Sequence, residues 1–291
     1  MDRRGIVLAG GSGSRLFPMT AAVSKQLLPI YDKPMIYYSL STLFLSDIRE
    51  ILIISTPRDL PLFRELLGDG STFGVRLEYA VQDRPNGLAE AFLIGERFLD
   101  GAPSALVLGD NVFYGEGFSD HLVNAGNRKT GATIFSYPVQ NPRDFGVVTF
   151  DQTGYATTIE EKPQKPRSNS AVVGLYFYDE RAPQFARELR PSARGELEIT
   201  DLNRCYMDLR ELYVEQLGRG FAWLDTGTCS SMLDATNFVA TLQRRQGLRI
   251  ACLEEIAFRK GWITKAQLMV SADRFGNSEY GAYLRELPLF A

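Results

Sequence analysis

Residues 6–16 read IVLAGGSGSRL, a short apolar run followed by a loop that holds three glycines in four positions. Glycines let backbone N–H groups come close to an anion, and the arginine at position 15 adds a fixed positive charge. No Gly-Lys-Ser/Thr follows, so this is not a Walker A loop, and Leu16 stands where a GxGxxG dinucleotide fingerprint requires glycine. The stretch therefore predicts a strand that ends in a phosphate-binding turn, with a plain glycine-rich strand-to-helix turn as the open alternative.

The chain beyond this stretch predicts further βαβ units. Short β-rich runs alternate with helical patterns, the runs at 51–55, 77–81, 105–108 and 133–137 and the helices at 35–45, 60–67, 88–98 and 118–127. Such alternation is typical of a parallel sheet covered by helices on both faces. After about residue 140 come a hairpin, a further strand and a long helix, at 145–161, 172–178 and 230–246. We expect a Rossmann-like α/β fold with a mixed, mostly parallel sheet flanked by helices, an antiparallel subregion and a C-terminal helical region.

The composition argues against several classes of protein. The 32 Lys and Arg nearly balance the 35 Asp and Glu, for a net charge of −3, so no basic excess favours a nucleic-acid partner. No apolar run approaches the roughly 20 residues that span a bilayer, and the first one is too short for a signal peptide. Cys205, Cys229 and Cys252 are widely spaced and form no CxxC pair. This predicts a cytoplasmic protein with no membrane partner, because disulfide frameworks belong to oxidising compartments.

A second cationic segment follows the glycine-rich loop and carries a family resemblance. Residues 25–35 read KQLLPIYDKPM, and with GGSGSRLFP at 10–18 they resemble the sugar-1-phosphate nucleotidylyltransferases, in particular the glucose-1-phosphate thymidylyltransferases. The family's other blocks follow in order: VLGDN at 107–111, EEKP at 160–163, GLYFY at 174–178, RGELEITD at 194–201 and WLDTGT at 223–228. The resemblance covers nearly the whole chain. It implies a nucleotidyltransferase domain over 1–240, with a nucleotide-binding part at about 1–140, a sugar-binding part at about 141–228, and a C-terminal helical region at 241–291 of the same compact unit.

The resemblance implies a reaction: α-D-glucose 1-phosphate and dTTP give dTDP-glucose and pyrophosphate, by Mg²⁺-dependent in-line attack on the α-phosphorus. It makes Arg15, Lys25 and Lys162 the catalytic cations, and Asp110 and Asp225 the carboxylates that hold Mg²⁺. The implied nucleotide-binding residues are Leu8, Gly10, Gly11, Gly13, Ser14, Arg15, Gln26, Gln82, Pro85, Gly87 and Asp110. The implied sugar-binding residues are Asn111, Phe145, Gly146, Glu161, Lys162, Val172, Tyr176 and Arg194. Lysine supplies a point charge for phosphate, carboxylate accepts from hydroxyl groups, and an amide offers both a donor and an acceptor to a base.

Two positions depart from the family pattern. Phe145 stands where the family usually has Tyr, and Cys229 follows Asp-Thr-Gly-Thr where His is common. The missing Tyr hydroxyl would lie near the sugar, so use of another sugar 1-phosphate stays open. Transfer of a uridylyl group is a further open alternative. A regulator that binds nucleotide sugars without catalysis is a second alternative, and a dinucleotide oxidoreductase is a third, weakened by the missing glycine at position 16.

The resemblance also implies assembly and feedback control. Members of the family form homotetramers, and many are inhibited by a downstream dTDP-sugar at a second site. The matching residues here are Tyr114, Gly115, Arg219, Gly220, Glu255, Ile256 and Arg259. The alternative is that the arginines are solvated and that Glu255 merely pairs with Arg259 one helical turn away, an interaction of about 0.2–0.5 kcal/mol.

Overall fold

The computed structural model describes residues 2–11 and 13–287, so Ser12 of the glycine-rich loop lies outside the described residues. The centre of the fold is the strand β1 (Arg4–Ala9), which pairs in parallel with β4 (Glu50–Ser55) on one side and β6 (Ser104–Leu108) on the other. β5 (Arg76–Val81) extends this parallel part beyond β4. Ile6 and Val7 are fully buried on opposite faces of the sheet, which explains why β1 reads as a continuous apolar run.

The other half of the same nine-stranded sheet is largely antiparallel. β11 (Ser170–Tyr178) runs antiparallel to β6, to β8 (Ala132–Pro138) and to β9 (Gly146–Phe150). β10 (Ala156–Glu161) forms the predicted hairpin with β9, while β12 (Leu212–Gln216) lies parallel to β8. The structure thus confirms the predicted α/β fold, with a mixed sheet and an antiparallel part.

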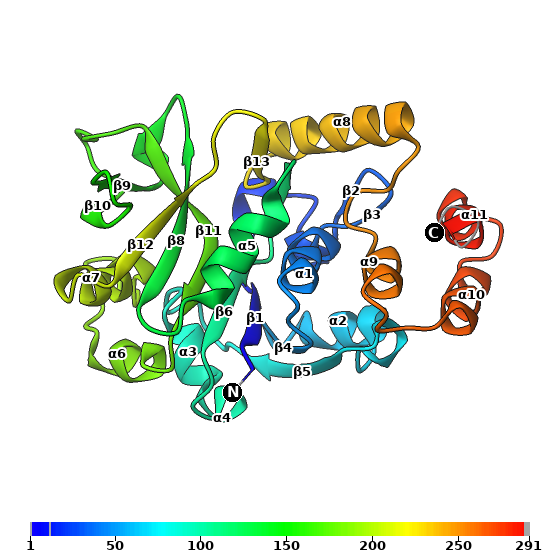
Figure 1. The fold of residues 1–291 in the computed structure, drawn as a ribbon, viewed down its shortest axis with the longest axis horizontal. Helices are drawn as coiled ribbons and strands as arrows, with labels where there is room; N and C mark the ends of the chain where they lie inside the picture. The colour runs from blue at the N-terminus through cyan, green and yellow to red at the C-terminus, as the bar shows by residue number, and fades with distance from the viewer. Residues whose placement is uncertain (1, 12, 288–291) are drawn as a thin grey trace.

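Helices cover both faces of the sheet (Figure 1). One face packs against α1 (Ile36–Leu45), α2 (Leu60–Leu67) and α5 (Phe118–Asn127). α9 (Leu253–Arg259) packs on α1, and α10 (Lys265–Arg274) and α11 (Glu279–Glu286) continue the same apolar core beyond α9 (Figure 1). The other face packs against α3 (Glu90–Ile94), α4 (Glu96–Leu99), α6 (Ala182–Glu188) and α7 (Ile199–Asp208). The predicted single helix at 88–98 is in fact two short helices that meet at Gly95. A Cβ at Gly95 would lie 3.2 Å from Ile6 and Leu52, so glycine lets this segment pack closely on the sheet.

Two small sheets lie outside the central one, and neither was predicted. β7 (Asn111–Gly115) pairs antiparallel with β13 (Phe221–Asp225), and β2 (Pro29–Ile30) pairs with β3 (Lys33–Pro34). The long helix α8 (Cys229–Gln246) begins directly after β13, with a reciprocal cap between Thr228 and Ser231. The proposed division at residue 240 falls inside α8 and stays a prediction. In the described part of the chain, none of the helices is long and apolar enough to cross a membrane.

Candidate active site

Two carboxylates from distant parts of the chain meet beside the carboxyl end of β6. Asp110 follows β6 directly, and the pairing of β7 with β13 sets Asp225 opposite Asn111. The Thr226 hydroxyl donates to the Asp110 carbonyl at 2.8 Å and fixes this junction. Burial and the neighbouring Asp110 charge together raise the pKa of Asp225 above its ordinary value of 3.8, against the opposing effect of Lys25. The two acids are therefore close enough to repel each other, as the ligands of one cation must be.

Two cations accompany this acid pair. Lys25 forms an ion pair with Asp110 and is largely buried there. Arg15 lies next to Asp225, because a Cβ placed on Gly227 would be 3.2 Å from Arg15 Nη2 and 3.1 Å from Asp225 Oδ1. Glycine at position 227 thus leaves room for the guanidinium group. The four side chains sum to no net charge, so the site can take up a metal ion together with an anionic ligand.

No group of three or more His, Cys, Asp or Glu side chains that could hold a metal occurs within residues 2–11 and 13–287. Asp110 and Asp225 alone would leave most positions of a hard cation to water and to phosphate oxygens. This sparse protein ligation is the kind that Mg²⁺ prefers, since it gives up its waters reluctantly. Asp110 and Asp225 therefore fit such an ion once the ion pair between Lys25 and Asp110 is broken.

A first cavity, of about 180 Å³, lies on the Asp110 side of the acid pair. Its lining includes most of the residues expected to bind the nucleotide: Leu8, Gly10, Gly11, Gln26, Gln82, Pro85, Gly87 and Asp110. Lys25 and Glu196 also line it. Gly13 and Ser14 are not in this lining; they form a tight turn, where Gly13 has φ +59° and accepts from the Thr20 hydroxyl. Gln26 is buried and donates to the Gly10 carbonyl at 3.3 Å, so it supports the glycine loop from within.

A second cavity, of about 620 Å³, lies on the Asp225 side. Arg15, Phe145, Lys162 and Asp225 line it, as do Trp223 and other residues near the start of α8. Lys162 is half-exposed and its Nζ is 3.8 Å from Glu161 Oε1. The backbone of Lys162 has φ +43°. Residues other than glycine rarely adopt this left-handed conformation, and such strained positions tend to mark functional sites. The acid pair therefore lies between two cavities, each with its own cations.

The expected sugar-binding residues form a cluster beside the second cavity. A Cβ on Gly146 would lie 3.5 Å from Glu161 Oε2 and 3.7 Å from Val172. Thr200 donates to Glu161 at 2.7 Å, while Arg194 binds Glu198 at 2.8 Å and reaches Glu161 only at 3.4 Å. The Arg194 guanidinium is thus directed mainly to its own loop.

Tyr176 and Asn111 are buried behind this cluster. Burial, followed by the charges of Glu161 and Asp110, raises the pKa of Tyr176, so its hydroxyl stays neutral. Asn111 donates to Asp110 Oδ1 at 2.9 Å, and its own Oδ1 accepts from the Trp223 indole at 2.5 Å. Asn111 therefore orients the Asp110 carboxylate. Trp223, Thr226 and Thr200 are supporting residues that sequence reasoning did not assign; all three stand in the quoted motif blocks, which was the available signal.

The residues expected to form a regulatory site fall into two groups in one chain. Tyr114 and Gly115 lie on β7, with Arg219 and Gly220 just before the paired strand β13, whereas the other three residues lie on α9. The helix α1 lies between them, since it contacts both β7 and α9. Tyr114 donates to Gln246 at 3.2 Å, and Glu255 accepts from Arg259 at 2.8 Å, as the alternative reading expects. Among the described residues no hydrogen bond joins the two groups.

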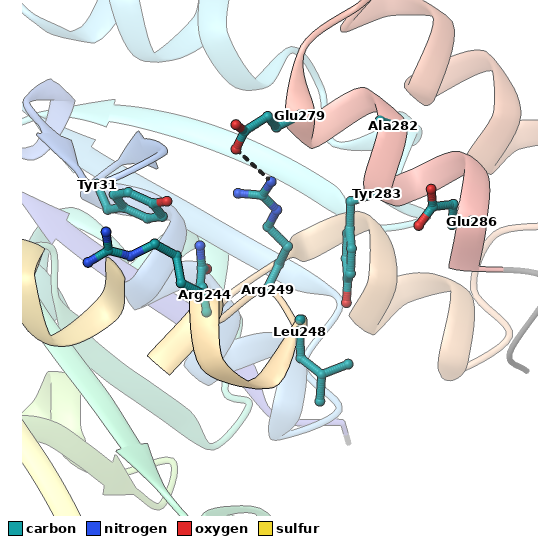
Figure 2. Close-up of a pocket in the computed structure, with 10 residues that line it drawn as sticks. Tyr31, Arg244, Leu248, Arg249, Glu279, Ala282, Tyr283 and Glu286 are labelled. Carbon is teal, nitrogen blue, oxygen red and sulfur yellow. Dashed lines mark ion pairs between the residues drawn. The ribbon is translucent and has the colours of Figure 1, made fainter. Parts of the chain in front are cut away.

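A third cavity, of about 390 Å³, lies between the end of α8, the β2–β3 hairpin and α11, and Figure 2 shows its lining. Arg249 pairs there with Glu279 at 3.5 Å and, below the surface, with Asp32 at 2.5 Å. Burial alone would raise the pKa of Asp32, but donation from the buried Lys33, from Gln243 and from Arg249 lowers it. Asp32, Arg249 and Glu279 thus connect the β2–β3 hairpin, which follows Lys25, to the C-terminal helices.

Comparison with known proteins bears directly on this site. The sequence profile of the nucleotidyl transferase family matches residues 4–241. A glucose-1-phosphate thymidylyltransferase of Xanthomonas campestris pv. campestris is 59% identical over 286 residues, which is 98% of this chain and 97% of that protein. One of Neisseria gonorrhoeae is 57% identical over 98% of this chain and 99% of its own. The solved structure of a Bacillus anthracis protein, assigned as a glucose-1-phosphate thymidylyltransferase and bound to sucrose, has a TM-score of 0.75 and 38% identity. That match covers 81% of this chain and 94% of the other.

Proposed function

The chain belongs to the nucleotidyl transferase family, and from that premise we propose that its first and second cavities are the two halves of one active site. The enzyme transfers a thymidylyl group from dTTP to α-D-glucose 1-phosphate, giving dTDP-glucose and pyrophosphate, as the names and near-complete coverage of its relatives support. The observation that carries the active-site proposal is the acid pair Asp110–Asp225, which lies between the cavities with a cation on each side.

The division of labour follows from this arrangement. The first cavity takes the nucleoside of dTTP. The glycine-rich loop takes the phosphates that leave as pyrophosphate, together with Arg15, which reaches them from the Asp225 side, where the second cavity begins. The second cavity takes glucose 1-phosphate, with Lys162 on its phosphate and Glu161 accepting from its hydroxyl groups. Lys25 lies at the α-phosphate, between the two substrates.

An oxygen of the sugar phosphate attacks the α-phosphorus while the bond to pyrophosphate breaks on the opposite side. No covalent enzyme intermediate is needed, because positioning and charge neutralisation supply most of the acceleration in phosphoryl-type transfer. Arg15 and Lys25 offset the charge that builds on the leaving group and on the α-phosphate. We propose Mg²⁺ as the divalent metal ion, held by Asp110 and Asp225; when bound, it neutralises triphosphate charge and polarises the α-phosphoryl group.

One assay tests this function against its alternatives. Pyrophosphate release is measured with dTTP, UTP and dCTP, each paired with glucose 1-phosphate and with its amino-sugar and deoxy-sugar analogues. We expect the highest kcat/KM for dTTP with glucose 1-phosphate. A clear preference for UTP or for another sugar phosphate would redefine the substrates. Binding of dTDP-glucose without release of pyrophosphate from any pair would identify a non-catalytic regulator instead.

We further propose a homotetramer with feedback inhibition by a downstream dTDP-sugar. Tyr114 and Gly115 lie on β7, which contacts α1 on one side, and Arg219 and Gly220 precede the strand paired with β7; Arg259 lies on α9, which contacts α1 on the other side, so both groups flank the same helix. Cytoplasm is the proposed compartment, since the three cysteines are free thiols.

A further inference from the structure

Glu90, at the start of α3, holds two side-chain amides with its two carboxylate oxygens. Its Oε2 accepts from Gln82 Nε2 at 2.7 Å, and its Oε1 accepts from Asn86 Nδ2 at 2.8 Å. Gln82 lines the first cavity and is 6% exposed, whereas Glu90 lies outside that lining. An ionised carboxylate can only accept hydrogen bonds, so it requires the NH₂ side of each amide to face it.

A second acceptor fixes the same amide. Gln82 Nε2 also donates to the Gly87 carbonyl at 3.3 Å, so both of its N–H hydrogens are used within the protein. Rotating the amide by 180° would bring Gln82 Oε1 to within 2.7 Å of a carboxylate oxygen, with no proton between them. The amide therefore has one permitted orientation, and Gln82 has no donor left to offer to a ligand.

The remaining acceptor points toward the glycine-rich loop. A Cβ on Gly10 would lie 2.9 Å from Gln82 Oε1, which places this oxygen in the part of the first cavity that Gly10 lines. Within residues 2–11 and 13–287, no hydrogen bond is made to this oxygen, and it is not among the buried unpartnered atoms. Gln82 thus presents one free acceptor to whatever occupies the cavity.

The loop that supplies these partners is rigidly placed. Gly87 has φ +109°, and a Cβ there would lie 2.3 Å from the Leu197 carbonyl oxygen, so only glycine fits. Leu197 donates to the Asn86 carbonyl at 2.7 Å and accepts from Ala89 N–H at 3.1 Å. The orientation of the Gln82 amide is therefore set before any ligand arrives.

We propose that Glu90 is a positioning residue that makes this enzyme select a base carrying a ring N–H. The proposal rests on the proposed function, in which the first cavity holds the nucleoside base. Thymine and uracil carry a hydrogen at N3 and can donate to Gln82 Oε1. Cytosine has a bare acceptor at N3, so two acceptors would face each other, and a site built around one hydrogen bond rejects a partner that cannot make it. Glu90 enforces this choice without touching the nucleotide.

The first test needs no variant. Binding of dTTP, N3-methyl-dTTP and dCTP to the wild-type protein is measured by calorimetry, alongside kcat/KM with glucose 1-phosphate. We expect dTTP to exceed both analogues by at least tenfold in affinity and in kcat/KM. Equal binding of dTTP and N3-methyl-dTTP would overturn the proposal. Failure to turn over dTTP at all would refute the proposed function, while the binding measurements would still decide the role of Gln82.

The second test changes only the orienting charge. Glu90→Gln keeps the shape, but its amide can donate as well as accept, so Gln82 is no longer held in one orientation. We expect the ratio of kcat/KM for dTTP to that for dCTP to fall at least tenfold, mainly through the nucleotide KM, with the KM of glucose 1-phosphate unchanged. Glu96→Gln, an exposed residue of α4 paired with Arg187, is the matched control and should keep the wild-type ratio. An unchanged ratio in Glu90→Gln, or an equal loss for both nucleotides, would mean that Glu90 is merely structural.

Discussion

Replacing Lys162 by alanine and by glycine separates the charge of this residue from its backbone strain. Its ammonium group lies 3.8 Å from Glu161 and is half-exposed, so that ion pair contributes at most about 1 kcal/mol to folding. A charge-assisted contact to a substrate phosphate is worth roughly 1.5–3 kcal/mol. At about 1.4 kcal/mol per factor of ten, both variants should lose about 10-fold to 150-fold in kcat/KM for glucose 1-phosphate.

The two variants should differ in stability, because φ at position 162 is +43°. A left-handed backbone costs lysine and alanine alike roughly 1–2 kcal/mol, whereas glycine avoids this cost and loses roughly 0.5–1 kcal/mol in chain entropy. We therefore expect alanine to leave the free energy of unfolding nearly unchanged, and glycine to raise it by up to about 1 kcal/mol.

Steady-state pyrophosphate release, with each substrate varied in turn, and denaturant unfolding measure the two effects. The KM of dTTP should change little in either variant, and Lys162→Arg should retain part of the activity. Activity that is lost in alanine but restored in glycine would show that backbone geometry, not charge, is what matters at this position. Wild-type kinetics in both variants would remove Lys162 from the site.

Four further predictions concern the metal, the sugar and regulation. Asp110→Asn and Asp225→Asn should each raise the Mg²⁺ concentration for half-maximal activity about tenfold or more, since each removes an anionic ligand; full activity at limiting Mg²⁺ would contradict this. Burial and the Asp110 charge raise the pKa of Asp225, so the folded metal-free protein binds the proton of this carboxyl more tightly than the unfolded chain does. The free energy of unfolding therefore falls as pH rises from 3.8 through the raised pKa. The rise in Tm caused by Mg²⁺ should therefore grow over the same pH range, and an equal rise at pH 4 and pH 7 would argue against the site. Phe145→Tyr adds a hydroxyl group beside Trp223 in the second cavity and should lower the KM of glucose 1-phosphate about 2-fold to 10-fold, which kinetics with varied sugar phosphate would check. Inhibition by dTDP-rhamnose should weaken in the double variant Arg219→Ala with Arg259→Ala; simple competition with dTTP and unchanged sensitivity would exclude a second site.

The fold was predictable where local pattern and burial agree. β1, β4 and β6 are buried on both faces and therefore read as continuous apolar runs. The pairing of β7 with β13 was missed because it joins segments about 110 residues apart, and the residues of β13 are only half-buried. Neither strand alone shows the alternation that marks a sheet. The break at Gly95 was missed for a similar reason, since the need for close packing on Ile6 is visible only once the sheet exists.

The sequence predicted the charged residues of the site, but not which of its hydrogen-bond donors and acceptors are already used within the protein. Arg15, Lys25, Asp110 and Asp225 are named by the motif blocks, and the fold brings them together. Gln82 donates both of its N–H hydrogens within the protein, to Glu90 and to the Gly87 carbonyl. These partners can be identified only from the three-dimensional structure. Sequence reasoning assigned Gln82 a donor and an acceptor, and the structure leaves it the acceptor.

The salt-bridge cluster around Asp32 also sets an order of events during synthesis. The segment that carries Lys25 leaves the ribosome early, but Asp32 is 217 residues ahead of Arg249, the partner that anchors the hairpin. At a translation rate of about 5–20 residues per second, the hairpin waits about 10–40 s for that partner. Throughout that interval Lys33 and Asp32 can form their own ion pair. Asp32 still lacks its pair with Arg249, and Lys33 still lacks its contact with the ring of Tyr280. A nascent chain that stalls before residue 249 would therefore hold Lys25 only through its ion pair with Asp110, because the hairpin that follows Lys25 would still lack its anchor to Arg249.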